Sequence, residues 1–161
     1  MDLLPFDEYV AQLPRKRMAA GVLLRSVDGR ILLVEPSYKP TWDIPGGSVD
    51  ADEAPWATAR RELREELGLD RPMNTVLVID HEHAANGYPE AMVWVFDGGI
   101  LDDSEHLHPT DEEIVSVGLY HLDEVSGKLK PALARRLSVA AGVAARGGPL
   151  ALCDDGVRRT P

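Results

Sequence analysis

Residues 47–69 read GSVDADEAPWATARRELREELGL, a pattern that predicts one amphipathic helix with well-marked ends. Pro55 fits the first helical turn, where its missing N–H costs nothing, and Gly68 fits the C-terminal cap. Between these two residues, apolar side chains recur at helical spacing. We expect the following residues to form the buried stripe of the helix: Trp56, Ala59, Leu63 and Leu67.

Three carboxylates lie beside that stripe. Because a helix turns about 100° per residue, Glu62, Glu65 and Glu66 share an arc of roughly 100°. A solvated face is the ordinary explanation, and Arg61 and Glu65 have the i,i+4 spacing of an ion pair. Glu62 and Glu66 are like charges at that same spacing, which destabilises a helix by about 0.2–0.5 kcal/mol. A divalent cation reverses this repulsion, and carboxylate oxygens suit Mg²⁺ or Mn²⁺. The spacing alone leaves both interpretations open.

The rest of the chain predicts a mixed β-sheet with helices packed on its faces. Asp28-Gly29 and Asn86-Gly87 are hairpin turn signals, and a second helix is expected from Pro131 to about Arg146. The expected strands are 17–25, 31–35, 75–83, 88–96 and 113–122, with a short extended piece at 42–44. We expect an N-terminal arm at 1–16, one domain at 17–146, and a tail at 147–161 with an edge strand at 150–153 and a mobile end from Val157.

Length and charge indicate a single-domain protein and argue against some classes of function. The chain has 161 residues, which fits one domain with a full-sized core, and a formal net charge of -10. That charge argues against a general nucleic-acid binder, which needs a basic face. The single cysteine, Cys153, allows no intrachain disulfide and favours a cytoplasmic setting. Residues 1–18 lack a signal-peptide pattern, and no apolar run is long enough to cross a membrane, so we expect no membrane partner.

The spacing from Gly47 onward is specific: a glycine, five residues, Glu53, seven residues, then Arg61 to Leu69. It follows a WDIPGG lead-in at 42–47 and resembles the signature of the Nudix hydrolase family, G-x5-E-x7-REUxEExGU with U aliphatic. All nine specified positions match. The resemblance implies the Nudix fold, an α+β fold whose mixed sheet is sandwiched between helices. It also implies hydrolysis of a diphosphate bond in a nucleoside di- or triphosphate derivative, with water attacking phosphorus and Mg²⁺ as cofactor, for which Mn²⁺ can substitute.

The resemblance assigns roles to residues of the signature. Arg61 is implied to orient a metal-binding carboxylate, often the one at the position of Glu53. The implied metal ligands are three side chains and one backbone carbonyl, namely Glu62, Glu65 and Glu66 and the carbonyl of Gly46.

The general base is less well defined. The family uses either a signature glutamate, here Glu65 or Glu66, or a residue on a later loop, here Glu112 or Glu113. Glu113 is also a candidate for an additional metal ligand. An acidic loop without catalytic role explains Glu112 and Glu113 equally well.

The substrate is open at this stage. Family members that hydrolyse ADP-ribose often carry a proline shortly after the signature, where this chain has Ala84 and Ala85. Tyr88 lies one residue later than the tyrosine of members that act on dinucleoside polyphosphates. A nucleoside triphosphate, a nucleotide sugar and a non-nucleotide diphosphate are further alternatives. Lys39 and Arg17 could contact phosphate, although a free surface role is the simpler explanation for each. The aromatic rings that could stack on a base are Tyr38, Trp42 and Tyr88.

Two other function classes share this fold. The first is a binding or sensor module without turnover, against which the intact signature argues. The second is a prenyl-diphosphate isomerase, whose chemistry uses a cysteine near the active site, whereas Cys153 lies in the tail. Homodimers are frequent in the family, so a homodimer is consistent with the resemblance.

Two histidine pairs, His81/His83 and His106/His108, have i,i+2 spacing. On a strand this spacing puts both rings on one face, where they could bind a transition metal. For His81 and His83, a place near the substrate mouth or on a polar sheet face is the simpler explanation.

Overall fold

The computed structural model describes residues 3–102, 105 and 107–160. These residues form three helices and eight strands. In chain order they are α1 (Phe6–Gln12), β1 (Arg17–Arg25), β2 (Ile31–Pro36), β3 (Gly46–Ser48), α2 (Pro55–Leu67), β4 (Val76–Glu82), β5 (Ala91–Ile100), β6 (Ile114–Tyr120), α3 (Pro131–Arg146), β7 (Ala151–Asp154) and β8 (Val157–Arg158).

The sheet is mixed, in the order β6-β2-β1-β5-β4-β7-β8, with β3 paired to β1 off this path. Strand β1 pairs in parallel with β5 along its whole length. Its other edge is divided, because β3 occupies it at Ala19–Gly21 and β2 joins it only at Arg25. The short strand β3 carries Gly46 and the first glycine of the signature, Gly47, and therefore lies against the central strand of the sheet.

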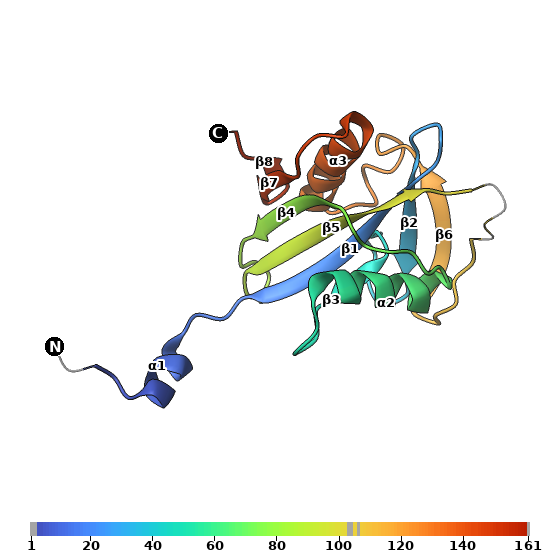
Figure 1. The fold of residues 1–161 in the computed structure, drawn as a ribbon. Coiled ribbons are helices and arrows are strands. Elements are labelled where there is room, and N and C mark those ends of the chain that lie inside the picture. The colour runs from blue at the N-terminus through green and yellow to red at the C-terminus, as the bar shows by residue number, and fades with distance from the viewer. Residues whose placement is uncertain (1–2, 103–104, 106, 161) are drawn as a thin grey trace.

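Helices cover the two faces of the sheet (Figure 1). The sheet has a hydrophobic core on each face, and alternate residues of β1 point into one core or the other. Leu23 packs in the cluster that includes α3, whereas Val22 and Leu24 pack in the cluster that includes α2. This alternation is what a strand covered on both sides requires. The prediction of an α+β fold with its sheet sandwiched between helices is confirmed.

The proline and glycine residues noted in the sequence mark where several helices and strands begin or end. Pro55 begins α2, and Gly68 caps it in the left-handed conformation with φ of 68°. Asn86 and Gly87 both have positive φ, 52° and 83°, as a two-residue type I′ hairpin turn requires. The turn connects β4 to β5, which pair antiparallel.

Three expectations were wrong. Trp56 has an exposed fraction of 56%, and the first turn of α2 buries Pro55 and Thr58 instead. Strand β3 was not among the expected strands, because three residues that include two glycines carry no alternating pattern. Val157 was expected to be mobile, yet it pairs with Asp154 in the β7–β8 hairpin.

The arm before β1 stands apart from the domain. Helix α1 has no buried residue and lies away from the sheet (Figure 1). The domain boundaries at residues 16 and 146 stay predictions. Within the described part of the chain, no helix combines the length and the apolar character that a membrane crossing needs.

Candidate active site

Arg61 is the centre of a carboxylate cluster on α2. Its Nε and Nη2 donate to the two oxygens of Glu53, both at 2.9 Å. Its Nη1 donates to Glu62 at 2.9 Å and to Glu65 at 3.0 Å. A planar guanidinium can hold three carboxylates in this way, whereas a lysine ammonium has no such fork. The Arg61 hydrogen bonds, followed by that from Thr58, lower the pKa of Glu53 to about 2.

Glu66 and Glu62 have a different environment. Burial, followed by the charge of Glu62, raises the pKa of Glu66 to about 8. Burial also raises the pKa of Glu62. The backbone N–H of Gly46 donates to Glu66 Oε2 at 3.3 Å. The like-charge pair recognised in the sequence is therefore partly removed from water, which increases the cost of keeping both groups ionised.

The glycine pair allows β3 to lie between β1 and α2. A Cβ on Gly47 would collide with the carboxylate of Glu62. Gly46 has a φ of 152°, and a Cβ there would collide with the backbone of Ala20 and Gly21. Only glycine therefore fits at either position without displacing the strand or the carboxylate. Whether the Gly46 carbonyl binds a metal stays a prediction.

The loop that carries Glu113 is attached to the C-terminal turn of α2. The Thr110 hydroxyl donates to the Glu65 carbonyl at 2.6 Å, and its N–H donates to the Glu66 carbonyl at 2.8 Å. The charge of Asp111 contributes to the raised pKa of Glu66. Glu113 itself is exposed, and within the described residues no hydrogen bond or ion pair joins its carboxylate to the glutamates of α2. Its roles as base and metal ligand stay predictions.

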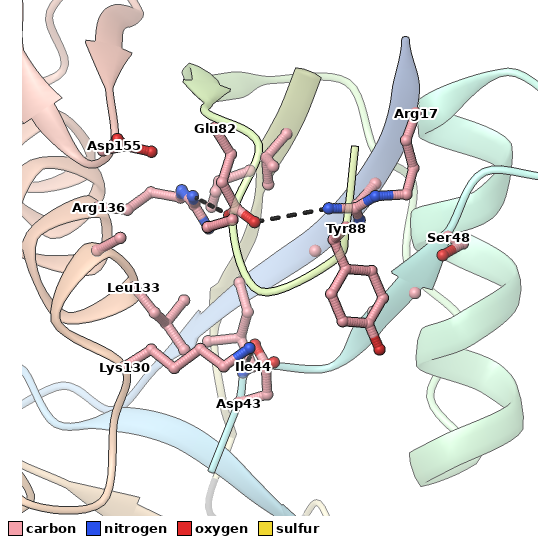
Figure 2. Close-up of a pocket in the computed structure, with 18 of the residues that line it drawn as sticks. Arg17, Asp43, Ile44, Ser48, Glu82, Tyr88, Lys130, Leu133, Arg136 and Asp155 are labelled. Carbon is pink, nitrogen blue, oxygen red and sulfur yellow. Dashed lines mark hydrogen bonds and ion pairs between the residues drawn. The ribbon is translucent and has the colours of Figure 1, made fainter. Parts of the chain in front are cut away.

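A cavity of about 780 Å³ borders Gly46 and Gly47. It extends between β1, the β4–β5 turn and the start of α3 (Figure 2). Its lining includes four basic side chains, Arg17, Lys39, Lys130 and Arg136, and the rings of Tyr38 and Tyr88. Arg17, Lys39, Tyr38 and Tyr88 were candidates from the sequence. Trp42 was another, but its ring packs on Tyr120 at 5.0 Å between centroids.

Arg136 was not recognised in the sequence. Its Nε donates to the buried Asp80 at 2.6 Å, and its Nη2 donates to Glu82 at 2.8 Å. Asp80 also accepts the N–H of Gly156 at 2.9 Å, which connects the C-terminal hairpin to β4. An aspartate at the end of the apolar run TVLVID was the signal that could have indicated a buried cationic partner.

A family model described as NUDIX domain matches residues 15–141. This chain belongs to the NUDIX family. The recognition of the Nudix family from the signature is therefore confirmed, and so is the Nudix fold. The family match includes all of α2, β3 and the Glu113 loop.

Two curated proteins are similar to parts of this chain. The chain is 40% identical over 70 residues to an RNA pyrophosphohydrolase of Gluconacetobacter diazotrophicus, covering 38% of this chain and 41% of that protein. It is 35% identical over 98 residues to an asymmetrical bis(5'-nucleosyl)-tetraphosphatase of Caenorhabditis elegans, covering 56% and 71%. The chain spans less than half the length of the first curated relatives that it matches.

A solved structure shows the same fold. The NUDIX domain of Shewanella oneidensis NrtR, crystallised with ADP ribose, superposes with a TM-score of 0.68. Sequence identity is 17%, and the match covers 88% of this Nudix chain and 99% of the other.

The structure describes only one of the two histidine pairs in full. His81 and His83 come together at the end of β4, with ring centroids 4.6 Å apart. His106 lies outside the described residues, so the second pair is untested.

Proposed function

We propose that this chain is a divalent-metal-dependent pyrophosphohydrolase that cleaves a diphosphate bond in a nucleoside di- or triphosphate derivative. The observation that carries the proposal is the carboxylate cluster around Arg61, next to a cavity with four basic side chains. Acidic groups that would bind metals and basic groups that would bind phosphates are thus neighbours, as phosphoryl transfer requires.

The donor set fits a hard divalent cation. Carboxylate oxygens are the ligands that Mg²⁺ prefers, and Glu62, Glu65 and Glu66 would hold it. The raised pKa of Glu62 and of Glu66 indicates that both are costly to ionise, Glu62 even with Arg61 beside it. When bound, the ion supplies positive charge that stabilises the phosphoryl oxygens and polarises the attacking water.

Two further tasks remain for the side chains: holding the carboxylates in place and taking a proton from water. Arg61 holds the carboxylates of Glu62 and Glu65 in place through its single Nη1. A carboxylate takes the proton of the attacking water, which contributes about 10²–10⁴-fold to the rate. Glu65 is our first choice because its side chain is 49% exposed and can reach water. Glu66, Glu112 and Glu113 are the alternatives.

The cavity supports a nucleotide-sized substrate. Its volume of about 780 Å³ lies within the usual range for small-molecule sites, about 300–1,000 Å³. Arg17 and Lys130 would neutralise phosphate oxygens, and the ring of Tyr88, over which Arg17 lies at 5.6 Å, would stack on a base. The net charge of -10 favours a small substrate over a long nucleic acid.

Phosphate and pyrophosphate release would test the proposal. The substrates are nucleoside triphosphates, ADP-ribose, nucleotide sugars and dinucleoside polyphosphates, each with Mg²⁺ and with Mn²⁺. An RNA oligonucleotide with a 5'-triphosphate belongs in the panel because of the Gluconacetobacter relative. We expect turnover of at least one nucleotide, which chelation by EDTA abolishes. Absence of turnover across the panel would refute the hydrolase and favour a binding module.

The variant Glu65→Gln tests the cluster directly. We expect its kcat to fall by about 10²-fold or more while its melting temperature stays that of the unmodified chain. Glu8→Gln, on the exposed helix α1, is the matched control and should leave kcat unchanged. Full activity of Glu65→Gln would show that Glu65 is neither base nor essential ligand.

A further inference from the structure

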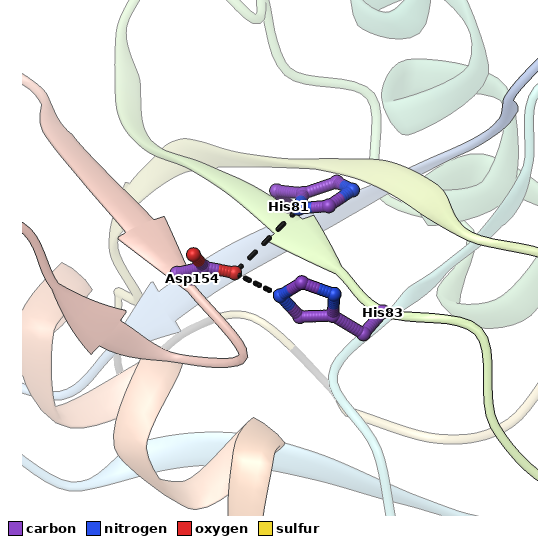
Figure 3. Close-up of side chains that lie close together, drawn as sticks. All are labelled: His81, His83 and Asp154. Carbon is purple, nitrogen blue, oxygen red and sulfur yellow. Dashed lines mark hydrogen bonds and ion pairs between the residues drawn. The ribbon is translucent and has the colours of Figure 1, made fainter.

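A second group of potential ligands lies outside the carboxylate cluster of α2. His81, His83 and Asp154 converge so that one ligand atom from each lies within 4.8 Å of the other two (Figure 3). His83 Nε2 is 2.6 Å from Asp154 Oδ1, and His81 Nδ1 is 3.5 Å from the same oxygen. Two imidazoles and one carboxylate thus face a common point.

The topology of the sheet produces this convergence. Strands β4 and β7 pair in parallel with His81 opposite Asp154. His83 is two residues after His81, so its side chain returns to the same face. The N–H of His83 donates to Asp155 at 3.0 Å, which fixes the backbone just beyond the end of β4. The three groups are therefore held by sheet pairing and by one further hydrogen bond.

A fourth residue orients the ring of His81. Glu90 Oε2 lies 2.7 Å from His81 Nε2, and Lys16 in turn pairs with Glu90 at 2.5 Å. A carboxylate on one ring nitrogen is the usual partner of a metal-bound histidine, because it directs the other nitrogen toward the ion. The other ring nitrogen, His81 Nδ1, faces Asp154 Oδ1 at 3.5 Å.

We propose that His81, His83 and Asp154 bind one divalent transition-metal ion, with Zn²⁺ as its representative. Zinc bonds to imidazole nitrogen and carboxylate oxygen are about 2.0–2.2 Å long, so tetrahedral ligand atoms lie about 3.3 Å apart. The separations of 2.6 Å and 3.5 Å lie on either side of that value. Two of the three ligand pairs are therefore close to tetrahedral spacing, and the third lies within 4.8 Å. Three protein ligands also leave one coordination position open.

The ion would strengthen one wall of the cavity. It would connect the end of β4 to the C-terminal hairpin of β7 and β8, and both His83 and Asp155 line the cavity. This site is separate in sequence from Glu62, Glu65 and Glu66 and differs from them in donor type. The inference holds whether or not the chain hydrolyses diphosphates.

Calorimetric titration with ZnCl₂ would test the site, in excess Mg²⁺ to occupy the carboxylates of α2. We expect one Zn²⁺ per chain. His83→Ala should weaken binding more than tenfold, whereas His121→Ala, an exposed histidine elsewhere, should not change it. Glu90→Gln should weaken binding by about 10–100-fold, because it removes only the orienting carboxylate. Circular dichroism would establish that each variant is folded.

Three outcomes would overturn the proposal. The first is that the unmodified chain binds no Zn²⁺. The second is that folded His83→Ala and Asp154→Asn bind it as tightly as the unmodified chain does. The third is that Glu66→Gln loses the ion while His83→Ala keeps it, because Zn²⁺ would then occupy the carboxylates of α2. Retained Zn²⁺ binding in Glu66→Gln supports a separate site.

Discussion

The raised pKa of Glu66 predicts that the metal-free protein loses stability as the pH rises. Burial and the charge of Glu62 raise this pKa from 4.5 to about 8. Between these values the folded chain holds a proton that the unfolded chain releases. Stability from this group is therefore fully present below about pH 4.5, declines as the pH rises, and is lost above about pH 8.

The magnitude follows from the size of that change. One pH unit is worth about 1.4 kcal/mol, so the full change in the free energy of unfolding is on the order of 5 kcal/mol. Glu66→Gln removes the ionisation but keeps an oxygen that can accept the N–H of Gly46. We expect the stability of Glu66→Gln relative to the unmodified chain to grow by about 4 kcal/mol from about pH 5 to about pH 8.

Urea unfolding in EDTA measures this difference directly. Other carboxylates titrate in both proteins, so the comparison between them reports on Glu66 and on its coupling to Glu62. Glu8→Gln serves as the control and should follow the unmodified chain at every pH. Added Mg²⁺ at about pH 8 should stabilise the unmodified chain more than Glu66→Gln, because binding to the folded state adds stability. A pH-independent difference between the two proteins would refute the reasoning.

Two further predictions concern packing at the site. Gly47→Ala should lower Mg²⁺-dependent turnover at least tenfold, because the added methyl group displaces the Glu62 carboxylate, and steady-state kinetics would show it. Arg136→Met should lower the free energy of unfolding by about 3–5 kcal/mol, because Asp80 would keep a buried charge without its partner, and urea unfolding would show it.

Matched substitutions control both experiments. Gly148→Ala adds a methyl group where nothing lies within 4 Å, so turnover should not change. Arg135→Met removes an exposed arginine from the same helix and should cost under about 1 kcal/mol. Equal effects of Arg135→Met and Arg136→Met would contradict the argument from burial, and normal turnover of Gly47→Ala would contradict the argument from space.

Local signals in the sequence predicted most of the elements. Pro55 and Gly68 mark the ends of α2 because their backbone preferences act within one turn. The i,i+4 spacing of Glu62 and Glu66 predicted that their carboxylates share one face of α2, because helical geometry alone determines that arrangement. Arg136 and Asp80 were missed because they are 56 residues apart in sequence and meet only when α3 packs on β4.

Other parts of the site also depend on the tertiary fold. Helical spacing includes Trp56 in the apolar stripe but does not say how far the core extends along the helix. Two adjacent glycines, Gly46 and Gly47, allow a close backbone approach. The element that they approach, β1, is known only from the sheet pairing. The pairing of Arg61 with Glu53 was implied by the family resemblance and is now visible as two hydrogen bonds.

The C-terminal hairpin has a consequence for aggregation. Strand β7 covers the outer edge of β4, and the family match ends at residue 141, before this strand begins. A chain shortened to residue 146 would leave the backbone N–H and C=O groups of β4 without partners along that edge. Such an edge is a template for pairing with other chains. Strand β7 therefore shields that edge of β4 from other chains, a task unrelated to any chemistry in the cavity.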